Sequence, residues 1–330
     1  MSRSRVVVLL FAFLALYAAA LPGERSALSL VKTIPLPGVT GRFDHFALDV
    51  KGRRLFVAAL GNNTLEAIDL AAGQRLQSIA GLPKPTGVLY LADRNELFVA
   101  CGDDGAFKVF NGVSLRPVRA VTGLDDADNV RFNAETGLIY LGCGSGALAV
   151  IRAATTEKIA SIELAAHPES FQLEKNGRRI FVNVPDARHV AVVDRERGAV
   201  IATWPMETFQ ANFPMALDEP GRRLFVGCRN PARLVVLDTT SSRKVADLAI
   251  SGDIDDLFYD AARHRLYASC GDGFVDIIAQ QNSDNYERLG RIPTAPGART
   301  SYFSPELSQF FLAVPERGAQ EAEIRIFDVK

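Results

Sequence analysis

The segment Arg53-Arg54-Leu55-Phe56-Val57 recurs without change at residues 222–226. Five other segments keep its apolar core, and the first apolar residues of consecutive copies lie 41 to 44 residues apart. These residues are Leu55, Leu97, Ile139, Ile180, Leu224, Leu266 and Phe310. Such regular spacing along most of the chain indicates a repeat protein.

Each copy has the pattern of four β-strands joined by tight turns. In the first copy, an apolar strand at residues 46–49 leads through a Lys51-Gly52 turn into the repeated segment, and further strands follow at residues 65–69 and 75–79. Glycine in such turns supplies the backbone freedom that a hairpin needs. The apolar residues do not follow the 3.6-residue period of a helix. Four antiparallel strands in about 40 to 45 residues are typical of a propeller blade, so the sequence predicts an all-β, seven-bladed β-propeller.

The two ends of the chain predict how the ring closes. The seventh copy reaches its third strand at residues 324–328 and has no fourth strand before Lys330. Residues 30–36 have the pattern of a fourth strand but precede any first strand. Pairing these two pieces would complete the seventh blade and leave no unpaired sheet edge. We therefore expect a single propeller domain over residues 21–330, closed by the N-terminal strand.

The repeat also carries a resemblance. The run from Arg53 to Asp69 resembles the YVTN-type repeat, which is WD40-like, and the chain after residue 20 resembles the YncE-like family of exported bacterial seven-bladed propellers. This resemblance implies the fold but says little about chemistry. The same fold serves lactonases, electron-transfer subunits, surface-layer proteins and binding modules.

The N-terminus has the three regions of a secretory signal peptide. Arg3 and Arg5 precede an apolar run over residues 6–20, with small residues at Ala18 and Ala20. The run is shorter than the roughly 20 residues that cross a bilayer, although a retained anchor is the alternative. We expect residues 1–20 to be a signal peptide and the mature protein to be periplasmic or secreted, with no membrane attachment after cleavage.

The composition and the missing motifs exclude several kinds of binding partner and cofactor. The chain has 37 lysines and arginines against 38 aspartates and glutamates, so no strong field favours nucleic acid. There is no Cys-x-x-Cys-His haem motif, and four histidines are too few for a histidine-rich copper centre. No phosphate loop, Gly-x-Ser-x-Gly elbow or zinc spacing occurs. We expect a monomer that requires no cofactor.

The four cysteines share one place in the repeat. Cys101, Cys143, Cys228 and Cys270 each come four residues after the first apolar residue of their copy. Packed sheets lie about 10 Å apart, and a disulfide needs Cα atoms within about 7 Å. We therefore expect four free, largely buried thiols.

The most variable column of the repeat lies where each innermost strand begins. Eleven residues before the aligned apolar position stand Asp44, Thr86, Asp128, Glu169, Phe213, Asp255 and Arg299. Nearby polar positions are His45, Asn129, His167, Asn212 and Asp256. All blades of a propeller direct this point toward the same rim of the central channel. We expect these residues to form a ligand-binding rim, with Phe213 as a wall for a ligand ring.

The polar rim has three interpretations. Its residues could simply face a water-filled channel. Alternatively, Asp44, Asp128, Glu169 and Asp255 could bind Ca²⁺ or Mg²⁺, which prefer oxygen ligands. The third interpretation is hydrolysis of the lactonase type, with Arg299 stabilising a developing oxyanion. We favour a binding or scaffold protein of the cell envelope that recognises a small molecule, a metal ion or a protein partner. Hydrolysis is the alternative, and the question of enzymatic activity stays open.

Overall fold

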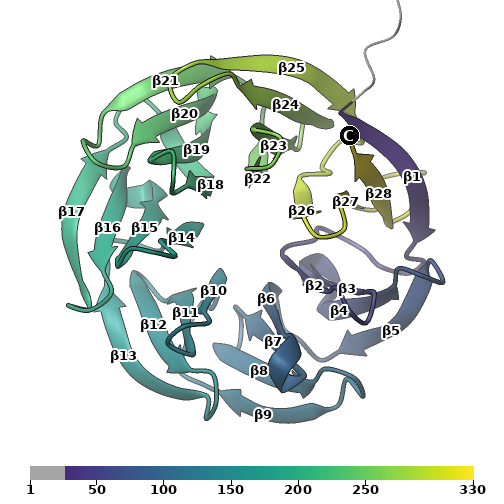
Figure 1. Cartoon of the computed structure of the whole chain (residues 1–330). Helices are drawn as coiled ribbons and strands as arrows, with labels where there is room; N and C mark the ends of the chain where they lie inside the picture. Colours follow the sequence, from purple (N-terminus) through teal and green to yellow (C-terminus); the bar gives the residue numbers. More distant parts are fainter. Residues whose placement is uncertain (1–26) are drawn as a thin grey trace, which may run out of the picture.

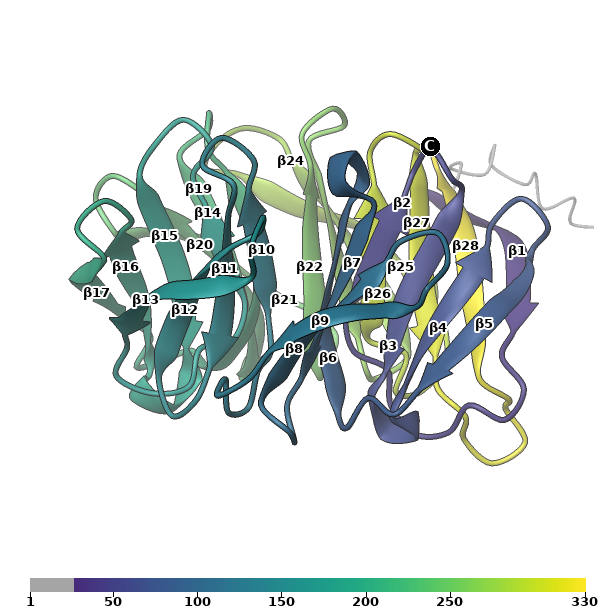
Figure 2. The ribbon, with the colours of Figure 1, turned by 90° about the horizontal axis from the view of Figure 1, so that it is seen from below.

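The computed structural model describes residues 27–330, which form seven four-stranded antiparallel sheets around a central channel (Figure 1). Viewed from the side, the sheets stand next to one another and their strands run between the two faces of the ring (Figure 2). The predicted signal peptide, residues 1–20, lies outside the described residues. The seven-bladed β-propeller predicted from the repeat is confirmed.

In the first six blades the strands run from innermost to outermost in chain order, and in the seventh blade the N-terminal strand is the outermost. The first blade consists of β2 (Phe46–Asp49), β3 (Arg54–Ala59), β4 (Thr64–Asp69) and β5 (Gln74–Ala80), and the second of β6 (Pro85–Leu91), β7 (Glu96–Cys101), β8 (Ala106–Asn111) and β9 (Pro117–Val121). The third consists of β10 (Val130–Asn133), β11 (Leu138–Cys143), β12 (Ala147–Arg152) and β13 (Glu157–Glu163). The fourth consists of β14 (Phe171–Leu173), β15 (Arg179–Val184), β16 (His189–Asp194) and β17 (Ala199–Pro205).

The remaining three blades follow the same plan. They are β18 (Gln210–Asp218), β19 (Arg223–Asn230), β20 (Ala232–Asp238) and β21 (Lys244–Ala249); β22 (Ile254–Asp260), β23 (Arg265–Cys270), β24 (Phe274–Gln280) and β25 (Tyr286–Pro293); and β26 (Thr300–Ser304), β27 (Gln309–Val314), β28 (Glu323–Val329) and β1 (Leu28–Pro35). Strand β1 pairs antiparallel with β28, from Leu28 opposite Val329 to Pro35 opposite Glu323. The predicted closure of the ring by the N-terminal strand is therefore confirmed.

The repeated apolar segment forms the second strand of each blade. In β3 and β27 every residue after the first is buried, because each sheet packs against a neighbour on both faces. The buried apolar residues of the described chain fall into seven clusters, one between each pair of adjacent blades. The core is therefore a ring of sheet-to-sheet contacts, which leaves the channel at its centre for other side chains.

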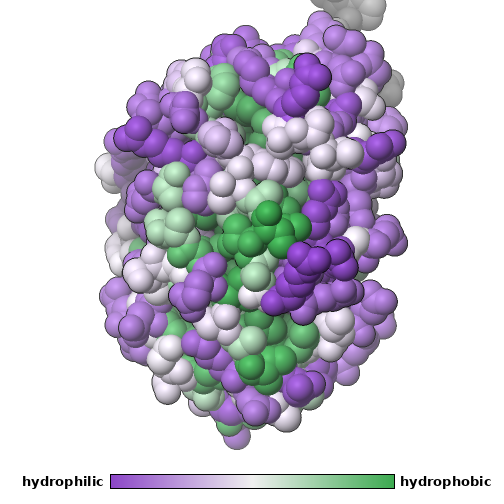
Figure 3. All heavy atoms as spheres, turned by 90° about the vertical axis from the view of Figure 1, so that its left-hand side faces the viewer, coloured by the Kyte–Doolittle hydropathy of each residue, from purple (hydrophilic) through white to green (hydrophobic). Residues whose placement is uncertain are grey.

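The outer strands are more exposed. Leu76, Val118, Ile159 and Ile201 lie on β5, β9, β13 and β17, and each exposes at least 40% of its surface. Figure 3 shows apolar surface interspersed with polar side chains on the outer edge of the ring. Scattered apolar residues of this kind are ordinary on soluble proteins.

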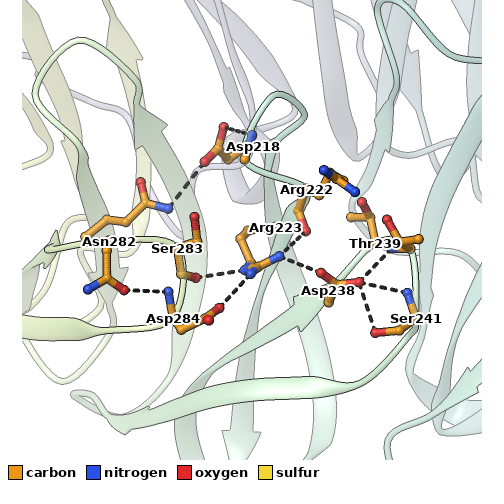
Figure 4. A network of polar contacts seen from close by, with 12 residues as sticks. Asp218, Arg222, Arg223, Asp238, Thr239, Ser241, Asn282, Ser283 and Asp284 are labelled. Atoms are coloured by element: carbon orange, nitrogen blue, oxygen red, sulfur yellow. Dashed lines mark hydrogen bonds and ion pairs between the residues drawn. The ribbon is translucent and has the colours of Figure 1, made fainter.

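The second arginine of the repeat links neighbouring blades. Arg54, Arg179 and Arg223 donate to the carbonyl oxygens of Gly112, Thr239 and Ser283 in the next blade, and Arg265 does the same to Lys330. We call each such arginine with its acceptor an inter-blade latch. In the fifth blade Arg223 also contacts Asp238 of its own blade and Asp284 of the next, at 2.6 Å each (Figure 4).

The cysteines are as expected, because all four thiols are free and buried. Burial raises the pKa of Cys101 to about 12, so this thiol stays protonated at neutral pH. No helix within residues 27–330 is long and apolar enough to span a membrane.

Candidate functional site

The starts of the seven innermost strands meet at one mouth of the channel. All seven residues of the variable column line a single cavity of about 250 Å³. They are Asp44, Thr86, Asp128, Glu169, Phe213, Asp255 and Arg299. The ring therefore brings together side chains that are up to 255 positions apart in the chain.

The neighbouring residues divide into two groups. His45, Asn129, His167 and Asp256 also line the cavity. Asn212 does not, because its side-chain amide is fully buried and donates to Asn183 Oδ1 at 2.9 Å and to the His189 carbonyl at 3.2 Å. Asn212 therefore supports the join between the fourth and fifth blades, away from the cavity.

Asp44, His45 and Asp128 form the tightest group at the mouth, with one candidate ligand atom from each lying within 4.8 Å of the others. Nδ1 of His45 lies 2.6 Å from Oδ1 of Asp44. This contact is an ion pair, because Nδ1 of His45 has no hydrogen-bond partner of good geometry. Burial works against the charged imidazolium, but the carboxylates of Asp44, Asp128 and Asp256 together outweigh it and raise the pKa of His45 to about 10. His45 is therefore a cation at neutral pH.

His167 is held between a carbonyl and two carboxylates. Its Nδ1 lies 2.7 Å from the Gly144 carbonyl oxygen, and its Nε2 lies 3.8 Å from Oδ2 of Asp128. Asp126 is also close, with Oδ2 at 3.7 Å from Nδ1. The interaction with Asp128 is the main reason that the pKa of His167 rises to about 9, against the opposing effect of burial. Both ring nitrogens then carry a proton, and His167 is a second cation.

Glu169 differs from the other carboxylates of the rim. Its side chain makes no hydrogen bond or ion pair with any residue that the structure describes. Burial, followed by the nearby charge of Asp128, raises the pKa of Glu169 to about 8. At neutral pH this carboxyl group is mostly protonated, although it could ionise readily beside a positive charge.

Asp255, unlike Glu169, has cationic partners and lies between two guanidinium groups. Arg229 donates to Oδ1 of Asp255, and Nε of Arg299 lies 3.2 Å from its Oδ2. Burial nevertheless raises the pKa of Asp255, and the two arginines oppose that shift. The guanidinium of Arg229 also stands 4.1 Å from the ring centre of Phe213. Phe213 lines the cavity as expected, but Arg229 already covers one face of its ring.

Asp256 lies deeper in the channel. Its Oδ2 accepts a hydrogen bond of 2.6 Å from the backbone N–H of Ser301. Burial raises the pKa of Asp256 to about 7, although the charge of His45 opposes the shift. This carboxyl group is therefore close to half ionised at neutral pH.

Sequence reasoning missed the cations that balance the rim. Arg42, Lys84, Arg131 and Arg229 all line the cavity. A signal for Arg229 was present in the repeat, because it comes five residues after Leu224, where the other copies have no charged residue. Arg131 comes three residues after Asp128, where the other copies have no charged residue either. Alignment of the seven copies at these two positions would have predicted a rim of mixed charge rather than an acidic rim.

The charges decide what the rim can bind. His45 is protonated and offers nitrogen, so it suits neither Ca²⁺ nor Mg²⁺, and Asp255 is already ion-paired with two arginines. Of the other candidate ligands, Asp44 faces His45 and Asp128 faces His167, whereas Glu169 has no cationic partner within ion-pair distance among the described residues. The rim can also bind a small molecule through charge-assisted hydrogen bonds of either sign.

Comparisons with known proteins support the fold. No family model and no curated protein matches the chain. Among solved structures, a chain of the mitotic checkpoint complex has a TM-score of 0.76 at 15% identity, covering 98% of this chain and 99% of its own length. A chain of Kuenenia stuttgartiensis hydrazine synthase has a TM-score of 0.73 at 15% identity, covering 84% and 95%. The chain thus shares the fold of these solved structures, and its own fold is a seven-bladed β-propeller.

Proposed function

We propose that this protein is an exported propeller of the YncE-like type that binds a small positively charged ligand at the channel rim. The ligand is a hard cation such as Ca²⁺ or Mg²⁺, or a small molecule with an ammonium group. The YVTN-type repeat and the signal-peptide pattern support the family and the export. We expect a monomer whose partner is a small molecule or another envelope protein, and no bound cofactor is needed for the fold.

The observation that carries this proposal is the unpaired carboxyl group of Glu169. It faces the cavity beside Asp128, and burial, followed by repulsion from the Asp128 carboxylate, raises the pKa of Glu169 to about 8. A bound cation would relieve that repulsion and ionise the group. Binding should therefore be coupled to release of the Glu169 proton.

Cation binding has a direct test at pH 7. We expect the wild-type protein to melt at a higher temperature in millimolar CaCl₂, MgCl₂ or putrescine than with EDTA. Calorimetric titrations in buffers of different ionisation heats should show release of close to one proton per bound cation. The Glu169→Gln variant should lose both effects, whereas Glu157→Gln, a change of an exposed glutamate on β13, should keep them. Equal melting in every additive contradicts the proposal.

Hydrolysis of a cyclic ester is the second candidate function. A carboxyl group with a pKa of about 8 can act as a general acid at neutral pH, and the guanidinium groups of Arg229 and Arg299 at the same cavity could stabilise an oxyanion. A screen with γ- and δ-lactones tests it. Activity in the wild type that is lost in the double variant Asp44→Ala, His45→Ala and in Glu169→Gln would favour the enzyme over the binding protein.

Export is tested by processing of the N-terminus. When the full chain is expressed in a bacterium, we expect the periplasmic or secreted fraction to contain a protein that begins near Leu21. Intact-mass spectrometry of that fraction measures the start. A full-length mass, together with recovery in the membrane fraction, would show a retained anchor instead.

A further inference from the structure

The half of the channel away from the rim is wider, and most of the residues that line it are apolar or aromatic. It forms a second cavity of about 590 Å³, within the range of about 300–1,000 Å³ that is usual for small-molecule sites. The apolar side chains that line it come from the innermost strands. They include Phe46, Leu48, Leu89, Tyr90, Phe132, Leu217, Leu257, Phe258, Tyr259, Tyr302 and Phe303. We call this cavity the aromatic funnel.

The aromatic funnel and the rim cavity share part of their lining, which we call the waist. Six residues line both cavities: His45, Arg131, Gln172, Asp256, Leu257 and Phe258. Arg131, on β10, also lines a third cavity of about 390 Å³ between the third and fourth blades. Its guanidinium group therefore stands where the internal spaces of the propeller meet.

Arg131 has only neutral partners. Its Nη1 donates to the Val130 carbonyl at 2.8 Å and to Asn129 Oδ1 at 3.2 Å, and its Nη2 donates to Ser170 Oγ at 3.5 Å. Within residues 27–330 no carboxylate is in ion-pair contact with it. This distinguishes it from Arg229 and Arg299 at the rim, which are both paired with Asp255.

This guanidinium group has no carboxylate in direct contact among the described residues, although Asp256 and Asp128 attract it from a greater distance. Arg131 touches the channel but is enclosed by protein, and burial lowers its pKa from the usual value. An arginine remains charged even so. Enclosing a charge without a partner costs free energy, which a ligand anion would recover by pairing with it. The remaining charges of the aromatic funnel also favour an anion, since His45 and Lys175 are cationic and Asp256 is the one carboxylate in its lining.

We propose that the aromatic funnel is a second binding site, which takes an organic anion with an apolar or aromatic body. The carboxylate of the ligand pairs with Arg131 at the waist, and its body packs against Phe132, Phe258 and Tyr302. This site is distinct from the cation site at the rim. It opens on the face where the first and second strands of each blade are joined, because its lining includes Tyr90 and Tyr259 near the ends of β6 and β22.

Three fluorescent probes with the same ring system separate charge from shape. They are naphthalene-2-carboxylate, naphthalene-2-methanol and (naphthalen-2-yl)methylammonium, each titrated into the wild-type protein and followed by fluorescence anisotropy. We expect the carboxylate to bind roughly tenfold more tightly than the alcohol, since hydrogen bonds to charged groups are the stronger ones. The ammonium probe should bind most weakly. Equal affinities for carboxylate and alcohol, or no binding of the carboxylate, would overturn the proposal.

Variants then assign the preference to Arg131. Arg131→Gln keeps hydrogen-bonding capacity but removes the charge, so the carboxylate should lose most of its advantage over the alcohol. Arg288→Gln, at an exposed position on the outer strand β25, makes the same charge change and should leave the preference intact. Arg131→Lys should keep part of it. If Arg131→Gln retains the full preference for the carboxylate, the assignment is wrong, and if that variant does not fold, the wild-type series still decides the sign of the ligand charge.

Discussion

Replacing Arg223 by methionine is expected to lower the free energy of unfolding by about 3 kcal/mol, the scale of breaking a buried ion pair. Arg223 is 8% exposed and joins two blades through Asp238, the Ser283 carbonyl and Asp284. Methionine fills much of the same volume, so the loss comes from the polar groups. Asp238, whose side chain is 21% exposed, would lose its cationic partner at the junction of the fifth and sixth blades.

Arg222→Met is the matched control. Arg222 is adjacent in sequence and exposed, and its side chain makes no hydrogen bond or ion pair with the part of the chain that the structure describes. We expect a change within about 0.5 kcal/mol, as is usual for a surface substitution. Urea denaturation followed by circular dichroism measures both variants. If Arg223→Met and Arg222→Met unfold at the same urea concentration, the inter-blade latch contributes nothing to stability.

The second large effect concerns pH. The melting temperature should fall by several degrees as the pH rises from 6 to 8.5, because folding raises the pKa of His45 to about 10, of His167 to about 9 and of Glu169 to about 8. The folded protein therefore binds protons more tightly than the unfolded chain. For the histidines, that stability is present below their ordinary pKa of 6.5 and is lost as the pH rises through 9 to 10. For Glu169, the loss begins above its ordinary value of 4.5.

Two glutamine variants test how much Glu169 contributes to this pH dependence. Glu169→Gln mimics the protonated carboxyl group at every pH, so its melting temperature should fall less between pH 6 and 8.5 than that of the wild type. Glu157→Gln changes an exposed glutamate and should follow the wild-type curve. Differential scanning calorimetry in a buffer without divalent cations gives the comparison. Parallel curves for all three proteins would mean that Glu169 ionises normally in the folded state.

The repeat made the fold predictable from the sequence. Seven copies of one apolar pattern fixed the number of blades, and the unmatched strand at residues 30–36 fixed the closure, because both depend only on the order of strands. The same alignment predicted the buried thiols and the residues at the mouth of the channel, since equivalent positions of a repeat occupy equivalent places in the ring. The place of a residue in the ring therefore follows from its position within the repeat.

Side-chain direction could not be predicted in the same way. Asn212 precedes Phe213 directly, but its amide turns into the join between blades while Phe213 faces the cavity. The pairing of Asp255 with Arg229 joins the end of β19 to the second residue of β22, which no single column of the repeat contains. The role of Arg54 and Arg223 as inter-blade latches could not be predicted either, because an arginine that recurs at one position of the repeat could equally be exposed to solvent.

The pairing of β1 with β28 has a consequence for the time at which the molecule can finish folding. A ribosome makes β1 before all the other strands of the propeller and β28 after all of them. The first strand must therefore wait until all the other strands have been made before it meets its partner, and the ring stays open until β28 has left the ribosome.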